Sequence, residues 1–237
     1  FTASHRAQHA VLMDLYTQVF CSDQLLLSNS LFAAILLRAV WTAKWLALWR
    51  NSAQFNLLIG VTLWVAAFWL FPVGMREGLK LHPLGATLFF LLFDWQIATL
   101  LLSAILLFTL RYQHLDFNVF GVVGLIKIAA PIALSWFGLR LFYRYGKPNY
   151  FAFVLWNGYC VSGITMLMVA SINGWCIASL GKYSAFILQN SYWVTLPTIS
   201  SSEAILTGLA ISGFAVALPQ AVAHFNADVY FTKKPPE

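Results

Sequence analysis

Charged residues are scarce in this chain. Asp, Glu, Lys and Arg make up only 9% of its 237 residues, whereas a soluble domain carries about 25%. Hydrophobic residues make up 60%, so an ordinary water-soluble domain is excluded because too few polar side chains are available to cover its surface. Cysteine is scarce as well. Cys21, Cys160 and Cys176 have no metal-site spacing, and we expect free thiols, with a Cys21–Cys176 disulfide as the alternative.

The apolar residues fall into long blocks. Phe55–Phe71 and Gly121–Leu139 are long enough, or nearly so, to cross a hydrocarbon layer of about 30 Å as helices. They lack the alternation of barrel strands, and lipid leaves only helices or closed barrels as spanning structures. The sequence therefore predicts an all-α polytopic membrane protein whose outer surface contacts membrane lipid.

About seven membrane segments are expected if a short one is counted. The short segment, Leu84–Phe93, cannot cross a bilayer alone, and Asp94 separates it from Trp95–Leu110. The two form either a tight helical hairpin with a re-entrant first limb or one bent unit. The other expected spans are Leu25–Leu48, Phe55–Phe71, Phe120–Phe142, Tyr150–Ser171 and Glu203–Leu218.

The positive charges indicate the orientation. If the N-terminus lies outside, the loops and tail on the inner side hold seven Lys and Arg residues and the outer segments hold five. An excess of Lys and Arg marks the cytoplasmic side, so we expect a multi-pass inner-membrane protein with its N-terminus outside and its C-terminus in the cytoplasm. Residues 1–24 then form an outer extension, 25–219 the membrane domain and 220–237 a cytoplasmic tail. Because the basic residues are scattered over loops, nucleic acid is not an expected partner.

Small residues recur at helical spacing in three predicted spans. Small side chains let helices approach closely in lipid, so helix packing explains Gly85 and the regular sets. These sets are Gly124, Pro131, Ser135 and Gly138; Gly158 and Ser162; and Gly208 and Ser212. Lys127 shares the first face, about two turns inside its span. A buried ammonium there is a functional candidate, with snorkelling toward the outer interface as the alternative.

His82 stands at the outer mouth of the short segment, directly before Pro83. Its imidazole could bind a borderline metal ion such as Ni²⁺, Co²⁺ or Zn²⁺, and a capped or solvated histidine is the alternative. Other candidate metal ligands are expected on the same side of the membrane: Glu203 at the start of the last span, His114 beside Asp116, and His5 with His9 in the extension.

Four segments, in order, resemble motifs of one family of membrane permeases. They are Gly78-Leu-Lys-Leu-His82-Pro-Leu-Gly85-Ala-Thr-Leu through Phe93-Asp-Trp-Gln, Lys147-Pro-Asn149-Tyr-Phe151, Ser202-Glu203-Ala-Ile-Leu-Thr207-Gly208, and Pro219-Gln-Ala-Val-Ala-His-Phe225-Asn-Ala-Asp228-Val-Tyr230. Together they are similar to the energy-coupling-factor transporter permeases related to the M component of cobalt and nickel uptake systems.

The resemblance implies a substrate-capture permease for a transition-metal ion, Ni²⁺ or Co²⁺, with no permanently bound cofactor. It also implies a transmembrane coupling subunit and separate ATPase subunits, and the chain itself has no G-x-x-x-x-G-K-[ST] nucleotide motif. In the family an N-terminal amine and a second-position histidine help the residue matched by His82 to hold the metal. Phe1-Thr2-Ala3 does not provide that clamp, so the resemblance supports the family's fold for this chain more strongly than the family's substrate.

Two other functions stay open from the sequence. The chain could keep this fold and bind a non-metal solute, or serve as an assembly partner without transport. An intramembrane enzyme is not expected, because Ser, His and acidic residues are not placed at matching depths and no H-E-x-x-H motif is present.

Overall fold

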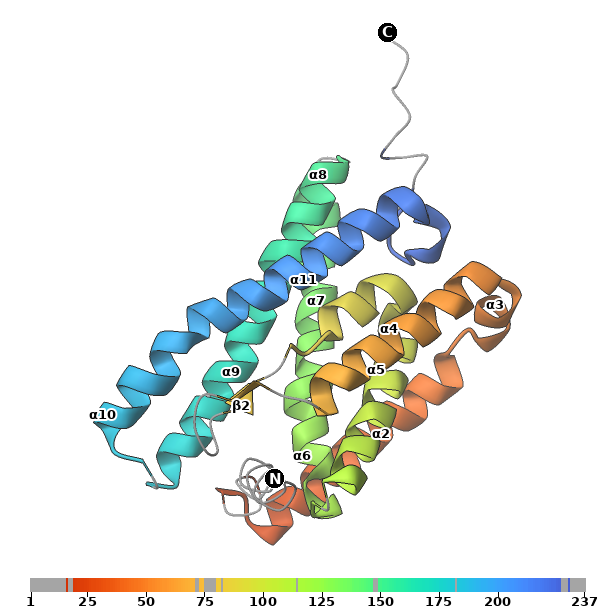
Figure 1. Cartoon of the computed structure of the whole chain (residues 1–237). Helices are drawn as coiled ribbons and strands as arrows, with labels where there is room; N and C mark the ends of the chain where they lie inside the picture. The colour runs from red at the N-terminus through yellow and green to blue at the C-terminus, as the bar shows by residue number, and fades with distance from the viewer. Residues whose placement is uncertain are drawn as a thin grey trace, which may run out of the picture.

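The structure of the chain is a computed structural model that describes residues 16, 19–70, 73–74, 80–81, 83–113, 115–146, 149–181, 183–226 and 230. Within these residues it is a bundle of helices with one short antiparallel strand pair, β1 (Val73–Gly74) and β2 (Lys80–Leu81) (Figure 1). Six stretches are long and apolar enough to span a membrane: Ser22–Thr42, Ser52–Leu70, Ala86–Tyr112, Phe117–Tyr145, Tyr150–Ser179 and Ala185–Ala217. The predicted fold class, an all-α polytopic membrane protein, is confirmed.

The first three stretches are α2 (Ser22–Thr42), α4 (Ser52–Leu70) and α5 (Ala86–Tyr112), and the last three are chains of consecutive helical segments. The fourth joins η1 (Phe117–Val119), α6 (Phe120–Gly124), η2 (Leu125–Ala129) and α7 (Ala130–Tyr145). The fifth joins α8 (Tyr150–Phe153), η3 (Val154–Val161) and α9 (Ser162–Ser179). The sixth joins α10 (Ala185–Ile187), η4 (Leu188–Tyr192), η5 (Trp193–Thr195) and α11 (Leu196–Ala217), and η6 (Pro219–Ala221) follows.

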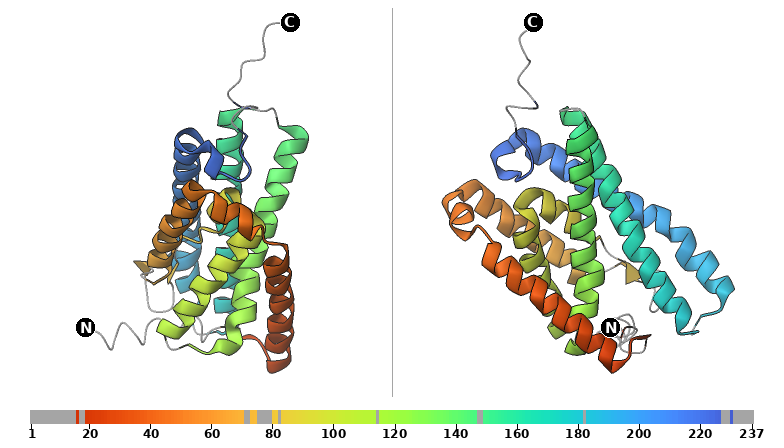
Figure 2. Two further views of the ribbon diagram at one scale, coloured as in Figure 1. Left: turned by 90° about the vertical axis from the view of Figure 1, so that its right-hand side faces the viewer. Right: turned by 180° about the vertical axis from the view of Figure 1, so that it is seen from behind.

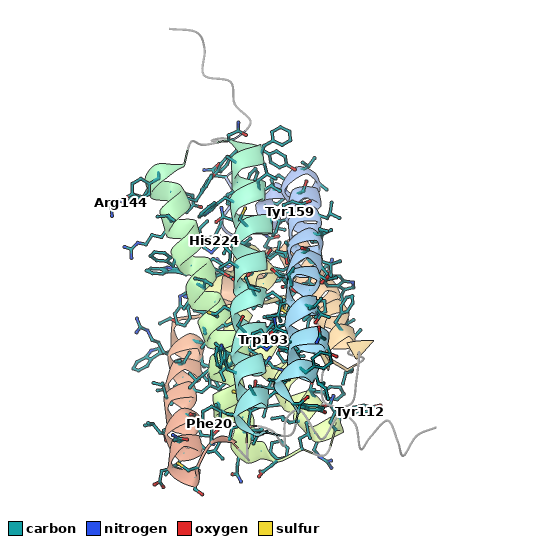
Figure 3. The ribbon with its side chains drawn as sticks, turned by 90° about the vertical axis from the view of Figure 1, so that its left-hand side faces the viewer. Phe20, Tyr112, Arg144, Tyr159, Trp193 and His224 are labelled. Carbon is teal, nitrogen blue, oxygen red and sulfur yellow. The ribbon has the colours of Figure 1, made fainter. Side chains whose placement is uncertain are left out.

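The long helices run along the bundle between two ends that Figure 3 marks by Tyr112 and Arg144, here named the Tyr112 end and the Arg144 end. Figure 2 shows α7 and α9 side by side along the bundle, where they pack against each other. Side-chain caps mark where helices begin. Asp116 accepts the N–H of Asn118 at the start of the fourth stretch, and Asn149 accepts the N–H of Phe151 at the start of the fifth.

The first span is shorter than predicted. The sequence predicts one helix over Leu25–Leu48, but α2 ends at Thr42 and a separate short helix, α3 (Trp45–Arg50), follows. Ala43 and Lys44 between them are non-helical, and the indole of Trp45 donates to the freed carbonyl of Val40 over 3.2 Å. The break therefore coincides with Lys44, the second charge of the predicted span, whereas Arg38 lies within α2.

Asp94 divides α5 into a short limb, Ala86–Phe93, and a long limb, Trp95–Tyr112. Its φ of 71° and ψ of 167° lie in a backbone region that is almost confined to glycine. The Asp94 carboxylate accepts the N–H of Trp95 over 2.8 Å and so caps the long limb. The predicted break at Asp94 is confirmed. Because the short limb runs from the bundle interior toward the Arg144 end and the long limb returns to the Tyr112 end, the arrangement is a hairpin with a re-entrant first limb (Figure 1).

The last span begins earlier than predicted. The sequence predicts a span over Glu203–Leu218 and a loop before it, whereas α11 begins at Leu196 and α10, η4 and η5 precede it. The serines before Glu203 are polar, and the sequence therefore favoured a loop there. Their hydroxyls bond to helix carbonyls, and such bonds do not break a helix. Ser201 donates to the carbonyl of Pro197, and Ser200 donates to the carbonyl of Gly163 on α9, both over 2.7 Å. Glu203 therefore lies inside α11 and not at its start.

The short limb forms the centre of the bundle. Every residue from Leu84 to Phe93 is buried, whereas only four of the 19 residues of α4 and two of the 21 residues of α2 are buried within the protein. A re-entrant segment cannot bridge the bilayer, and it is tolerated at membrane depth only where protein surrounds it. The other spans meet this requirement by enclosing the limb.

Candidate functional site

The start of the short limb is held by a carboxylate from the last span. Glu203, which is 3% exposed, points both carboxylate oxygens at the backbone before Ala86. One oxygen accepts the N–H of Leu84 over 2.9 Å, and the other accepts the N–H of Gly85 over 3.0 Å. We name this arrangement the limb clamp. It binds the N–H of the N-cap residue Gly85 and that of Leu84 before it, which have no partner within the helix, and it places negative charge at the positive end of the limb.

Two further features lock the clamp in place. The indole N–H of Trp69 on α4 donates to the carbonyl of Leu84 over 3.2 Å, so both backbone groups of Leu84 are bound. Gly85 has a φ of +68°, and a Cβ placed there would lie 2.8 Å from the Val65 side chain. A glycine is thus required both by the left-handed backbone and by the close approach of α4.

The space around the limb clamp is almost closed. A cavity of about 10 Å³ lies beside Glu203, bounded by the limb, α4 and α11, which is room for one water molecule at most. Next to it, a groove of about 410 Å³ opens between α4 and α11, and it shares Trp64 and Leu88 with the small cavity. The carboxylate is therefore shielded from bulk solvent and bound to fixed backbone donors.

Of the predicted metal ligands, Glu203 is the one that the structure describes. His82, His114, His5 and His9 lie outside the described residues. In the part of the chain that the structure does describe, no group of three or more His, Cys, Asp or Glu side chains could hold a metal ion. Glu203 was expected to orient the His82 imidazole or to bind metal directly. In the structure its two oxygens bind the backbone that follows His82 and Pro83.

Lys127 lies in η2, one turn of π-helix within the fourth stretch. It is 6% exposed, and α2, α5 and α9 pack against η2, so its side chain faces protein and not lipid. No hydrogen bond or ion pair to the Lys127 ammonium occurs among the described residues. π-Helical turns within α-helices are frequent at functional sites, and they were not predictable from the spacing of small residues.

The small residues on the predicted faces make close helix contacts. A Cβ on Gly124 would overlap the ring of Phe32, and one on Gly138 would meet Val161. Pro131 and Ser135, on the same face, are buried, and the Ser135 hydroxyl lies 2.9 Å from that of Thr87 on the short limb. This face of the fourth span therefore packs against α2 at Gly124, the short limb at Ser135 and η3 at Gly138.

The fifth and sixth spans meet through glycine. A Cβ on Gly158 would lie 3.1 Å from the Cα of Gly208, so the two backbones are in contact. Ser162 donates its hydroxyl to the carbonyl of Gly158, and the Tyr150 hydroxyl lies 2.8 Å from that of Ser212. These contacts fix α11, and with it Glu203, against the rest of the bundle.

The far end of the short limb is held by residues that sequence reasoning missed. The carbonyl of Leu92 accepts the N–H of Ala223 over 3.1 Å, and it also accepts the side chain of Gln54 over 3.3 Å. His224 stacks on Phe90 with ring centroids 4.9 Å apart, and its Nε2 lies 3.6 Å from the Asp94 carboxylate. Figure 3 shows His224 in the half of the bundle nearer the Arg144 end. In the sequence, this segment was marked by the last of the four family-like motifs, which contains His224, but its contact with the limb was not indicated.

Cys21, Cys160 and Cys176 are free thiols in the structure. Cys21 is exposed and Cys176 is buried on α9, so the disulfide alternative is not present.

A bundle of six spans around a buried re-entrant limb defines a multi-pass membrane protein, and comparison with known proteins assigns its family. Residues 17–221 match the CbiM family, described as the cobalt uptake substrate-specific transmembrane region. The chain belongs to this family, which is a family of membrane components for metal uptake. No protein of curated function matches it in sequence.

Solved structures show the same fold. A crystal structure of a transition metal transporter aligns with a TM-score of 0.61 at 15% identity, over 84% of this chain and 90% of that chain. A truncated transition metal transporter aligns with a TM-score of 0.60 at 14% identity, over 84% of this chain and 95% of that chain. At this identity the likeness establishes the fold alone.

Proposed function

We propose that this chain is the substrate-capture permease of an energy-coupling-factor transporter for a transition-metal ion, Ni²⁺ or Co²⁺. Its membership of the cobalt-uptake family supports the substrate class, and its likeness to transition metal transporters supports the architecture. The ion is the cargo of the protein, and no permanently bound cofactor is needed for this role.

The limb clamp carries the proposal for the site. His82 is the proposed metal ligand, and Glu203 and Trp69 fix the backbone only two residues further along the chain. A metal site gains affinity and selectivity when its ligands are held in place before the ion arrives. Glu203 therefore acts as a positioning residue for the ligand, and His114, His5 and His9 are proposed as lesser contributors to the ion's coordination.

Lys127 is proposed to act in transport and not only in packing. A buried ammonium without a partner in the described part of the chain is costly within a membrane protein, and such groups mark transport pathways. A fixed positive charge inside the bundle raises the energy of a cation that enters it. Lys127 would then help to confine the ion to the outer site until the permease changes conformation.

In this proposal separate subunits supply the energy for release, since residues 1–237 contain no nucleotide-binding motif. We propose a transmembrane coupling subunit and ATPase subunits as partners. The protein would lie in the bacterial inner membrane with the Tyr112 end outside and the Arg144 end in the cytoplasm, as its Lys and Arg distribution favours.

Calorimetry on the purified, detergent-solubilised protein with NiCl₂ and CoCl₂ at neutral pH tests the function. We expect stoichiometric binding of at least one ion by the wild type and none by His82→Ala. Binding should weaken as the pH falls, because protons compete with the metal for the imidazole nitrogen. Asp23→Asn is the control, because it removes an exposed metal-binding type of side chain at the Tyr112 end that has no contact with the limb.

Two results would contradict the metal proposal. One is a wild type that binds neither ion, and the other is a His82→Ala variant that binds as well as the wild type. Either result would favour a non-metal solute or an assembly role on the same fold.

A further inference from the structure

The outer face of α7 near the Arg144 end is not covered by the bundle. Trp136, Phe137 and Tyr143 are 45%, 56% and 56% exposed, and Arg140 and Arg144 are exposed beside them. These residues recur at spacings of three and four, so they share one side of the helix. Figure 3 shows Arg144 projecting away from the bundle. We name this surface the α7 cationic face.

The two guanidinium groups of this face are held by aromatic rings. Arg140 lies over the ring of Trp136 with its Cζ 4.7 Å from the ring centroid, and Arg144 lies over Tyr145 at 5.3 Å. Since Trp136 is one turn earlier in α7, the Arg140 side chain folds back toward the middle of the span. A ring that stacks on the face of a guanidinium leaves the in-plane N–H donors at its edge able to bind an anion.

Carboxylates of the described chain do not neutralise these arginines. Glu203 is bound in the limb clamp, and Asp94 lies beside His224. Asp116 caps the turn at Asn118, and Asp23 lies in the first turn of α2; both are at the Tyr112 end. Neither Arg140 nor Arg144 forms an ion pair with any residue that the structure describes. The α7 cationic face thus presents two positive charges that no described carboxylate balances.

We propose that the α7 cationic face binds the phosphate headgroup of an anionic phospholipid. The planar guanidinium presents several N–H donors in a fork that matches phosphate oxygens, and here two of them stand one turn apart on one helix. Anionic headgroups lie at the depth where a spanning helix reaches the membrane surface, and basic residues at that depth attract them.

The order of residues along α7 favours a lipid over an acidic protein surface. Phe137 and Trp136 lie about 10 Å deeper along the helix axis than Arg144, at 1.5 Å per residue, where acyl chains lie. Aromatic side chains there, followed by Arg140 and Arg144, match the succession from acyl chain to headgroup in one lipid molecule. A protein partner would not require that succession.

Native mass spectrometry can test the site with two lipids of identical acyl chains, palmitoyl-oleoyl phosphatidylglycerol and palmitoyl-oleoyl phosphatidylcholine. The full chain is released from detergent with both lipids at equal concentration, and the retained lipids are counted. We expect the wild type to retain phosphatidylglycerol preferentially. The double variant Arg140→Gln/Arg144→Gln should retain it about 25-fold less, because each basic residue near an anionic surface contributes a factor of about five.

The matched control is Arg111→Gln, which removes an exposed arginine from the last turn of α5 at the Tyr112 end and should leave retention unchanged. Thermal melting of all variants checks that the fold is intact. Equal retention of the two lipids by the wild type would overturn the proposal and favour an acidic protein surface as the occupant. Wild-type retention by the double variant would also overturn it.

Discussion

The carboxylate of Glu203 in α11 accepts a hydrogen bond from the backbone N–H of Gly85, 118 positions earlier in the chain, over 3.0 Å. The last span therefore caps the re-entrant limb in the middle of the bundle. The other end of the limb is bound by the segment that follows α11, through Ala223 and His224. Movement of α11 must therefore either carry the limb with it or break these bonds. This links the segment next to His82 with the Arg144 end of the protein.

Replacing Glu203 by Gln tests the clamp. The amide has one carbonyl oxygen for two backbone donors, and its NH₂ group would face an N–H. We expect Glu203→Gln to lower the free energy of unfolding by about 1–3 kcal/mol, the cost of a buried donor left without an acceptor. Metal binding should weaken with it, because the backbone after His82 is released.

Thermal melting in detergent and calorimetry with NiCl₂ measure the two effects. Asp23→Asn is the matched control, because Asp23 is an exposed acid at the start of α2, and it should change stability by less than about 0.5 kcal/mol. A Glu203→Gln variant as stable as this control would show that the clamp adds nothing to the fold.

Gly85→Ala tests the same backbone by adding a side chain to it, whereas Glu203→Gln removes an acceptor. The left-handed conformation alone costs a non-glycine residue about 1–2 kcal/mol, and the new Cβ would lie 2.8 Å from Val65. We expect a loss of at least that size in melting experiments, only partly restored by Val65→Ala. Gly60→Ala on α4 is the control, because nothing lies within 4 Å of its Cβ position, and it should be neutral or stabilising. A harmless Gly85→Ala would contradict the backbone geometry at the limb clamp.

The membrane class, the break at Asp94 and the buried faces could be predicted because each follows from local composition. Ten apolar residues ended by a single carboxylate leave few alternatives within a bilayer. The start of the last span could not be placed, because the serines before Glu203 are polar in sequence but bond to helix carbonyls in the fold.

The role of Glu203 could not be predicted from the sequence either. Its motif marked the residue as a candidate, but its partners are backbone N–H groups, which have no signature in sequence. The same limit applies to Trp69, whose indole binds the carbonyl of Leu84. A π-helical turn, such as the one around Lys127, depends on packing against neighbouring helices and is not visible in residue spacing.

Lys127→Met separates function from packing. Methionine keeps an unbranched side chain of similar length but removes the charge, so membrane insertion should be unchanged or improved. The variant should be more stable, by about 1–3 kcal/mol, because a buried polar group without a partner among the described residues is removed. Metal uptake by cells should fall at the same time. Full uptake by Lys127→Met would show that the ammonium has no part in transport.

Topology is tested with reporter fusions at four positions. Fusions after Arg50, Lys147 and Lys233 should report the cytoplasm, because each follows a span that runs away from the Tyr112 end and the Lys and Arg excess lies at the Arg144 end. The re-entrant limb makes this possible, since α4 and the long limb of α5 both run toward the Tyr112 end. A fusion at Gly181, in the turn between α9 and α10, should report the outer side; positions from 185 onward are unsuitable because they are helical. The reverse pattern would place the start of the limb, and His82 with it, toward the cytoplasm. Capture of a metal ion from outside would then be impossible at this site, although the helical bundle and the limb clamp would stand unchanged.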